Sequence, residues 1–200
     1  ERTMYTVIGS PMTRAFRVIW VLEELGQPYT LTPATPQSAE ILAVNPSGKV
    51  PALQVEGETL TDSAAIITYL ADKHSALTAP AGTLARAHQD AMTQQCLDEL
   101  DAVLWTAARH SFALPKEHRL PEIKDSLKWE FARNISRIEA KFKGPYVMGE
   151  MFTIADVILT HCLSWAYGAK FPIESQTLLD YGKAMRKRPA HQRASAQAKS

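Results

Sequence analysis

Ser10 is placed where a hydroxyl could stabilise an anion. It follows a β-prone run at 4–8 and precedes a helical pattern at 14–25. Backbone N–H groups and the helix dipole favour negative charge at such a place, and a hydroxyl can donate a hydrogen bond to a bound thiolate. Lowering a thiol pKa from about 8.5 by two units takes about 2.7 kcal/mol, within reach of one charge-assisted bond and a dipole. Thr13 is the alternative donor, although its position also suits an N-cap.

A second group of candidates lies in the segment 45–53, which reads Asn-Pro-Ser-Gly-Lys-Val-Pro-Ala-Leu. Pro51 cannot donate in a strand ladder and therefore belongs at the start of a strand; if its peptide is cis, the backbone of Val50 is turned towards a ligand. Val50 could then pair with a peptide through main-chain hydrogen bonds, as an added strand does. Lys49 offers a point charge for a carboxylate, although a lone lysine in a turn is more often an ordinary surface residue.

Asp62 and Ser63 form the third group, at the beginning of a predicted helix. The carboxylate of a zwitterionic amino-acid head accepts hydrogen bonds from a hydroxyl and from helix N–H groups, while its ammonium needs an anion. Helix capping alone is the simpler interpretation of this pair. The conjunction of the three groups is what favours a binding site.

The elements that must position these residues indicate two domains. Up to about residue 80, short β-like runs alternate with helical ones, whereas the sequence after Thr83 is helical in pattern. Strands are predicted at 4–8, 29–32, 50–55 and 58–60, and helices at 14–25, 38–42, 63–73, 84–109, 121–143, 153–166 and 175–188. The predicted fold class is α/β plus all-α, with a βαβαββα domain at 4–78 and an all-helical bundle domain at 84–200.

Thr153 and Asp156 have the spacing of a capping box in its aspartate variant. We interpret both as folding residues at the start of a helix and not as catalytic groups.

Taken together, the motifs resemble the cytosolic glutathione transferase family over nearly the whole chain. They are Ser-Pro-x-x-Arg from residue 10, the segment 45–53, Asp-Ser-x-x-Ile from residue 62 and Phe-Thr-Ile-Ala-Asp from residue 152. The resemblance implies that the first domain is thioredoxin-like and that Ser10 activates the sulfur of glutathione, as in theta-, phi-, tau- and zeta-like classes. Neither tyrosine nor cysteine stands at this position, which speaks against the alpha, mu, pi, omega and beta classes.

The resemblance also assigns roles around the tripeptide. Val50 pairs with the cysteinyl backbone, and Pro51 matches the cis-proline of the family. Lys49 reaches the glycyl carboxylate, and Asp62 and Ser63 hold the γ-glutamyl head.

By the same resemblance, the helical domain provides a pocket for a hydrophobic electrophile and the protein is a homodimer. Large apolar groups with few polar ones suit such a ligand. The expected lining is Met12, Trp105, Ala108, Arg109 and Phe112, with Trp165 and Tyr167 as further candidates. The implied activity is transfer of an alkyl or aryl group to the glutathione sulfur, in detoxification. The alternatives are a glutathione-dependent isomerase or peroxidase, and a non-catalytic binding or assembly module.

Composition excludes several other classes. With 46% apolar residues and a net charge of +1, the chain predicts neither a nucleic-acid nor a membrane partner. The amino end has no apolar signal region, so a cytoplasmic location is expected. Cys96 and Cys162 are separate, helical and outside any CxxC pair, and the six histidines form no metal-binding pattern. The basic stretch after Asp180 is expected to be a helix end followed by a solvated tail.

Overall fold

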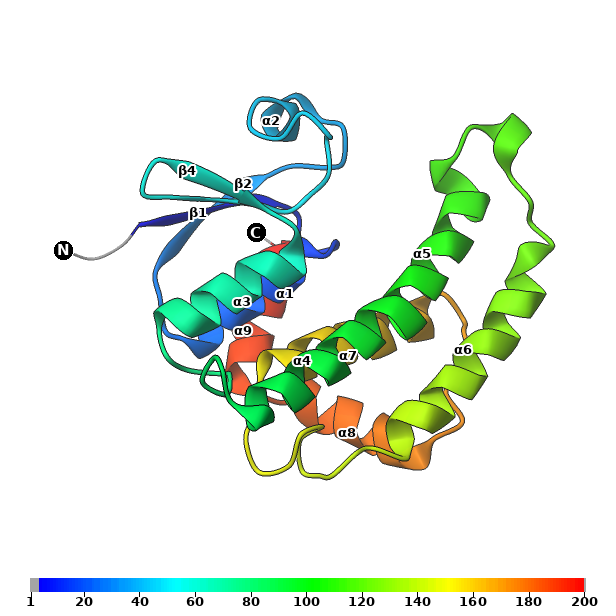
Figure 1. Cartoon of the computed structure of the whole chain (residues 1–200). Helices are drawn as coiled ribbons and strands as arrows, with labels where there is room; N and C mark the ends of the chain where they lie inside the picture. The colour runs from blue at the N-terminus through cyan, green and yellow to red at the C-terminus, as the bar shows by residue number, and fades with distance from the viewer. Residues whose placement is uncertain (1–3, 200) are drawn as a thin grey trace. The chain divides into compact units, whose positions relative to one another are not determined.

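The computed structural model describes residues 4–199, which form two compact units (Figure 1). The first, here called the sheet unit, comprises the chain up to Ala81 and again from Arg186 onward. The second, the helical unit, comprises Gly82–Met185. These units differ from the predicted domain ranges in the segment from Arg186, which clusters with the sheet.

The sheet unit is built on four strands in the order β2-β1-β3-β4. They are β1 (Tyr5–Gly9), β2 (Tyr29–Pro33), β3 (Ala52–Val55) and β4 (Glu58–Thr61). Strand β1 pairs in parallel with β2 and antiparallel with β3, and β3 pairs antiparallel with β4. Helices α1 (Ala15–Glu24) and α3 (Ser63–Lys73) lie on one side of the sheet and the short α2 (Ala39–Leu42) on the other (Figure 1). The predicted thioredoxin-like order βαβαββα is confirmed.

One set of paired residues across the strands shows where the loops next to them lie. Ile8 of β1 pairs with Ala52 of β3, which pairs in turn with Thr61 of β4. Strand β3 runs antiparallel to both neighbours. The end of β1, the start of β3 and the end of β4 therefore lie side by side at one end of the strands, which is called the sheet edge below. The loops that carry Ser10, Val50 and Asp62 therefore converge.

The helical unit begins with one long, nearly continuous helix. It consists of α4 (Leu84–Cys96), the π-helical η1 (Leu97–Asp101), α5 (Ala102–Ala108) and the π-helical η2 (Arg109–Ala113). A short 3₁₀ turn, η3 (Lys116–His118), precedes α6 (Ile123–Glu139), α7 (Ile154–Gly168) and α8 (Gln176–Arg186). The predicted helical second domain is confirmed.

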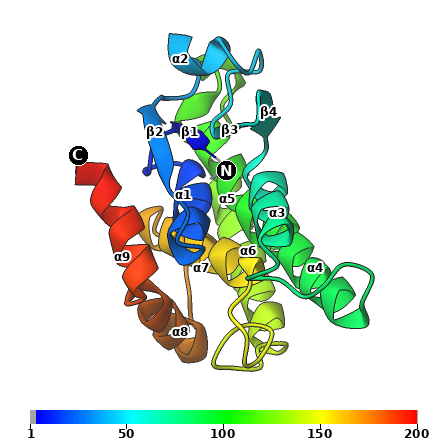
Figure 2. The ribbon, with the colours of Figure 1, turned by 90° about the vertical axis from the view of Figure 1, so that its left-hand side faces the viewer.

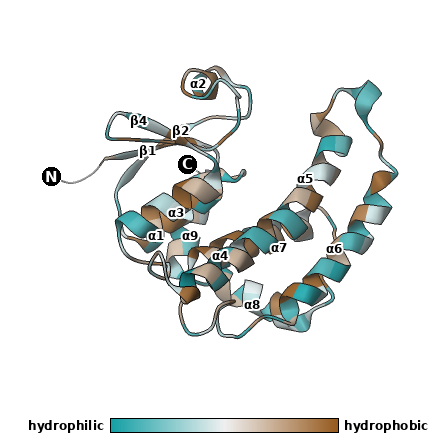
Figure 3. Ribbon diagram, in the orientation of Figure 1, coloured by the Kyte–Doolittle hydropathy of each residue, from teal (hydrophilic) through white to brown (hydrophobic). Residues whose placement is uncertain are grey.

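Helix α7 is the central helix of this unit and packs against α4 and α5. Ten of its fifteen residues are buried, whereas α6 alternates hydrophilic and hydrophobic residues along its length (Figure 3). The buried residues of α6 recur at helical spacing, which gives the helix one inward face; they are Leu127, Phe131, Asn134, Ile135 and Ile138. Across residues 4–199, no helix combines the length and apolarity that crossing a bilayer requires.

A fully buried carboxylate, Asp156, ties the start of α7 to two other segments. Its Oδ1 accepts hydrogen bonds from the Val147 N–H at 2.9 Å and from the Tyr181 hydroxyl at 2.7 Å. Its Oδ2 accepts from the Thr153 N–H at 2.9 Å, which is the aspartate half of the predicted capping box. Burial, and then the Asp156 charge, hold the pKa of Tyr181 well above its usual value, so the phenol remains a donor.

The basic carboxyl end is not the solvated tail that the sequence suggested. Pro189 begins a further helix, α9 (Pro189–Ala196), because a proline is well tolerated at the first helical position. Helix α9 runs beside α1 (Figure 2). The Nε and Nη2 atoms of Arg188 donate to the two carboxylate oxygens of Glu24 at 2.7 and 2.9 Å, and Arg193 donates to Glu23 at 2.6 Å.

His191 is the buried centre of this contact between α9 and α1. Only 8% of it is exposed, and its ring lies edge-on to Phe16 and Trp20, with centroids 4.9 and 4.7 Å away. Burial, and then the Arg186 charge, lower the pKa of His191 from 6.5 to about 4, against the opposing effect of Glu24. The folded protein therefore holds this histidine neutral.

We expect the free energy of unfolding to fall as the pH drops from about 6.5 to about 4, because the unfolded chain takes up this proton first. One such group contributes up to about 1.4 kcal/mol per pH unit in that window. His191→Phe keeps an aromatic ring without a titratable nitrogen, so its stability should depend less on pH. Urea unfolding of both proteins across this range measures the difference. Equal slopes would contradict the assignment.

Candidate functional site

Ser10 lies half-buried in the loop that leaves β1. Its Oγ accepts a hydrogen bond from the Met12 N–H at 3.2 Å. Among residues 4–199 its hydroxyl proton has no acceptor, so the proton is available to a ligand. The N–H bond to Oγ polarises the hydroxyl and makes it a better donor.

Thr13, the alternative donor, is already engaged. Its hydroxyl donates to the Ser10 carbonyl at 2.6 Å and accepts from the Ala15 N–H, at the first residue of α1, at 3.2 Å. Its one hydroxyl proton is therefore used in holding the loop. This geometry favours Ser10 over Thr13 as the donor to a bound thiolate.

Gly9 lets this loop approach the start of β3. A Cβ added at Gly9 would lie 2.7 Å from the Ala15 Cβ, too close for any side chain, and 3.6 Å from both the Pro51 Cα and the Val50 Cβ. The end of β1 thus touches both α1 and the Val50–Pro51 peptide.

The Val50–Pro51 peptide bond is cis. The Val50 N–H and C=O have no hydrogen-bond partner in the described part of the chain. Lys49 is exposed, and among residues 4–199 its ammonium has no anionic partner. A peptide backbone and a carboxylate are the groups that would satisfy this combination.

Asn45 holds this loop in shape, a role that the motif alone did not reveal. Only 9% exposed, it donates from Nδ2 to the Lys49 carbonyl at 2.9 Å, and its Oδ1 accepts from the Ser47 N–H at 3.2 Å and hydroxyl at 2.9 Å. Its side chain thereby positions Lys49 and the peptide that follows. The signal in the sequence was an Asn-Pro pair followed by Ser and Gly, a combination typical of a structured turn.

Asp62 caps α3, as the simpler interpretation had it. Its Oδ1 accepts from the Ala64 and Ala65 N–H groups, both at 3.0 Å, and its backbone has a positive φ of 71°. The side chain itself is exposed, so Oδ2 remains open to a cation. Capping and binding are therefore compatible at this residue.

Ser63 is 5% exposed, and its Oγ accepts a hydrogen bond from Nη1 of Arg17 at 3.3 Å. Since Arg17 supplies a donor, the Ser63 hydroxyl proton is directed elsewhere and can be donated to a ligand. The sequence analysis did not identify Arg17, which lies on α1 and is fully buried. A cation inside the apolar pattern of that helix was the signal that could have revealed it.

The predicted electrophile residues fall in both units. Met12, in the sheet unit, is 82% exposed. The other four share one helix face, because they are spaced three or four residues apart. They are Trp105 and Ala108 of α5, and Arg109 and Phe112 of η2. Arg109 donates from Nη2 to the Thr106 hydroxyl at 3.0 Å, and its buried Nε has no partner among the described residues. The pocket that would join Met12 to this face stays a prediction.

Within residues 4–199, no group of three His, Cys, Asp or Glu side chains could hold a metal ion. The polar groups at the sheet edge are hydroxyls, amides, one lysine and one carboxylate. Such a set recognises a small zwitterionic peptide by hydrogen bonds and charge.

Comparison with known proteins finds similarity to glutathione transferases. Residues 4–79 match the family model described as the N-terminal domain of glutathione S-transferase. The glutathione S-transferase GstA of Escherichia coli O157:H7 is 27% identical over 184 residues, covering 86% of this chain and 88% of that protein. The glutathione S-transferase GST-4.5 of Xanthomonas campestris is 28% identical over 164 residues, covering 76% and 78%.

Solved structures agree. A glutathione transferase from Methylococcus capsulatus superposes with a TM-score of 0.86 at 26% identity, covering 98% of this chain and 100% of that one. The theta-class glutathione S-transferase of Xanthomonas axonopodis pv. citri, solved with glutathione bound, shares the fold with a TM-score of 0.77 at 24% identity, covering 95% and 96%. The chain is thus similar to glutathione transferases in its fold, and its residues 4–79 match their N-terminal domain.

Proposed function

We propose that this protein is a serine-type glutathione transferase, in which Ser10 stabilises the thiolate of glutathione for attack on a hydrophobic electrophile. The observation that supports this most strongly is the Ile8–Ala52–Thr61 row, which brings three loops with unused donors and acceptors to one sheet edge. The proposal includes the cytoplasmic homodimer that the family resemblance implies.

The polar groups at this edge match the three parts of an extended tripeptide. The cysteinyl backbone pairs with the Val50 N–H and C=O, in the manner of strand addition. The γ-glutamyl carboxylate takes the Ser63 hydroxyl and N–H, because Asp62 already occupies the N–H groups of Ala64 and Ala65. Its ammonium takes the open oxygen of Asp62.

The chemistry follows from this placement. The glutathione thiol gives its proton to solvent, and the resulting thiolate accepts a hydrogen bond from the Ser10 hydroxyl, which the Met12 N–H polarises. The sulfur lone pair then forms a bond to the electrophilic carbon, and the leaving group departs with the electrons of the bond that breaks. The protein lowers the thiol pKa and positions the two reactants, without using a nucleophile of its own.

Calorimetric titration with glutathione, followed by thioether formation with an activated aryl chloride such as 1-chloro-2,4-dinitrobenzene, tests the proposal. We expect saturable binding and release of chloride in step with thioether. Absence of binding would overturn the proposal. Binding without product from aryl chlorides, hydroperoxides or double-bond isomers would instead identify a non-catalytic relative.

A separate prediction concerns Lys49. Lys49→Met should raise the KM for glutathione about two- to fivefold with little change in kcat, since an exposed ion pair contributes about 0.2–1 kcal/mol. Lys143→Met, at an exposed lysine of the helical unit, is the matched control. Glutathione amidated at its glycyl carboxyl should bind the native protein and Lys49→Met equally well. A Lys49 effect that persists with the amide would contradict the assigned contact.

A further inference from the structure

The helix face predicted to hold the electrophile carries a cation. Arg109, the first residue of η2, is half-buried, and among residues 4–199 its guanidinium pairs with no carboxylate. Its Nη2 donates to the Thr106 hydroxyl at 3.0 Å, and that hydroxyl donates its own proton to the Ala102 carbonyl at 2.8 Å. The Thr106 oxygen therefore holds the guanidinium in place through a lone pair, but it does not neutralise the charge.

The other donors of Arg109 are unused. Its buried Nε has no acceptor among the described residues, and its Nη1 has none there either. Burying such a donor without a partner costs stability, so an acceptor supplied by a ligand would offset an existing deficit. Because the side chain as a whole is only half-buried, a ligand can reach the guanidinium from solvent.

Stabilisation of the helix end does not account for this cation. A positive side chain near a helix C-terminus can interact with the free carbonyl groups there. In η2, however, the Arg109 carbonyl accepts a hydrogen bond from the Leu114 N–H at 3.0 Å. Arg119 donates from Nε to the Leu114 carbonyl at 2.7 Å and from Nη2 to the Phe112 carbonyl at 2.8 Å. Since Arg119 already serves the helix end, the charge of Arg109 remains for another partner.

Aromatic side chains precede and follow Arg109 on the same helix. Trp105 lies four residues before it and is half-buried, and Phe112 lies three residues after it and is 69% exposed. All three residues belong to the helical unit. An aromatic ring with a carboxylate complements this set, because the ring can lie against the apolar side chains while its two carboxylate oxygens accept from the planar guanidinium.

We propose that Arg109 is a specificity-determining residue, which selects aromatic electrophiles that carry a carboxylate. The carboxylate accepts hydrogen bonds from the guanidinium, and the aromatic ring lies against Trp105 and Phe112. Arg109 takes no part in the bond changes, which remain the attack of the glutathione sulfur on carbon and the departure of the leaving group. The inference rests on the transferase function proposed above, since it names the class of the second substrate.

Calorimetric titration of the full chain with 3,5-dinitrobenzoate and with its neutral amide, 3,5-dinitrobenzamide, tests the contact without a reaction, because neither compound has a chloride to displace. We expect the native protein to bind the benzoate more tightly than the amide. Arg109→Gln should bind the benzoate about tenfold more weakly and the amide unchanged. Arg109→Lys keeps the charge without the planar fork and should recover part of the affinity. A native protein without preference for the benzoate, or undiminished benzoate binding by Arg109→Gln, would overturn the proposal.

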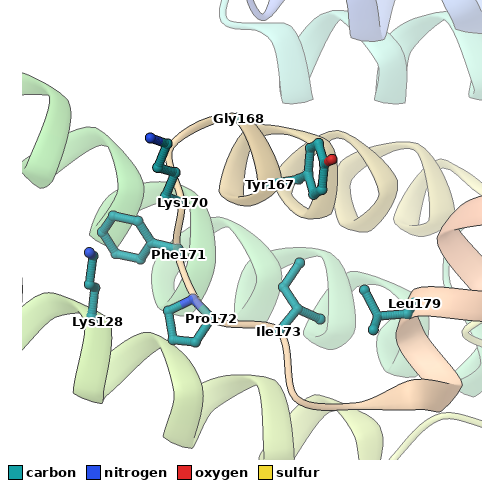
Figure 4. Close-up of a pocket in the computed structure, with 8 residues that line it drawn as sticks. All are labelled: Lys128, Tyr167, Gly168, Lys170, Phe171, Pro172, Ile173 and Leu179. Carbon is teal, nitrogen blue, oxygen red and sulfur yellow. The ribbon is translucent and has the colours of Figure 1, made fainter.

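Two control variants remove positive charges elsewhere in the helical unit. Arg137→Gln changes an exposed arginine of α6, and Lys128→Gln changes a lysine of a separate cleft between α6, the end of α7 and the start of α8 (Figure 4). No residue between 105 and 112 lines that cleft. Both controls should bind the benzoate like the native protein. Loss of benzoate binding in Lys128→Gln, with retention in Arg109→Gln, would place the anion in the cleft and overturn the proposal.

Conjugation separates this inference from the function on which it rests. For 4-chloro-3,5-dinitrobenzoate, Arg109→Gln should lower kcat/KM about tenfold, and for 4-chloro-3,5-dinitrobenzamide less than about twofold. Equal losses with the two chlorides would overturn the role in selection while the transferase function stands. Benzoate binding through Arg109 without conjugation of either chloride would overturn the transferase function, and with it the role in selection, and leave a carboxylate-binding site.

Discussion

Ser10→Ala is expected to raise the thiol pKa of bound glutathione by about two units and to slow conjugation about ten- to hundredfold at neutral pH. The loss follows because the Ser10 hydroxyl, in the loop after β1, has a proton with no acceptor in the described part of the chain and is the donor that we assign to the sulfur. The ultraviolet absorbance of bound thiolate, followed against pH, measures the pKa directly. The affinity for glutathione itself should change much less, since the remaining contacts persist.

Thr13 provides the control for this experiment. Thr13→Ser keeps the hydroxyl that donates to the Ser10 carbonyl and should behave like the native protein. Thr13→Val should cost about 1 kcal/mol in unfolding free energy, as loss of a cap does, yet retain the thiolate signal. If Ser10→Ala keeps the signal and Thr13→Val loses it, the two roles are reversed.

Asp156→Ala is expected to lower the free energy of unfolding by about 3–5 kcal/mol, because an orphaned buried donor costs about 1–3 kcal/mol. The substitution strands the Val147 and Thr153 N–H groups and removes the acceptor that lies 2.7 Å from the Tyr181 hydroxyl. Asp156→Asn keeps one acceptor oxygen and should lose less. Urea unfolding monitored by circular dichroism gives the values.

Asp180 is the matched aspartate for this comparison. It lies exposed in the same unit and accepts a hydrogen bond from Gln176 at 2.9 Å. Asp180→Ala should therefore shift stability by no more than about 0.5 kcal/mol. If folded Asp156→Asn loses turnover at native stability, our interpretation of Asp156 as a folding residue is wrong.

The sequence predicts the fold well because each element carries a periodic apolar pattern of its own. The β-prone run 4–8 corresponds to β1, and Gly26 follows directly after α1 and its C-cap residue, Leu25. Two boundaries were missed for definite reasons. The first long helix continues past Arg109 in a π-helical turn, which does not follow the 3.6-residue period. The last predicted helix was followed by a solvated tail, whereas Pro189 begins a further helix.

The candidate site is only partly predictable. The types and spacing of Ser10, Val50 and Asp62 follow from the chain, and the register brings their loops together. The choice between the Ser10 and Thr13 hydroxyls as donor does not follow from the chain. It depends on the acceptor of the Thr13 hydroxyl proton, which only the structure shows. Arg17 was missed since apolar periodicity does not reveal which polar group a buried cation meets.

The placement of α9 has a consequence for biosynthesis. Helix α1 is synthesised well before the residues that cover Trp20 and Phe16, which belong to the segment after Arg188. A nascent chain on the ribosome therefore carries these aromatic rings without the His191 contact until more than 160 further residues have been synthesised. This half of the protein completes its packing only after the intervening helices have been synthesised, which lengthens the interval in which chaperones can act on it.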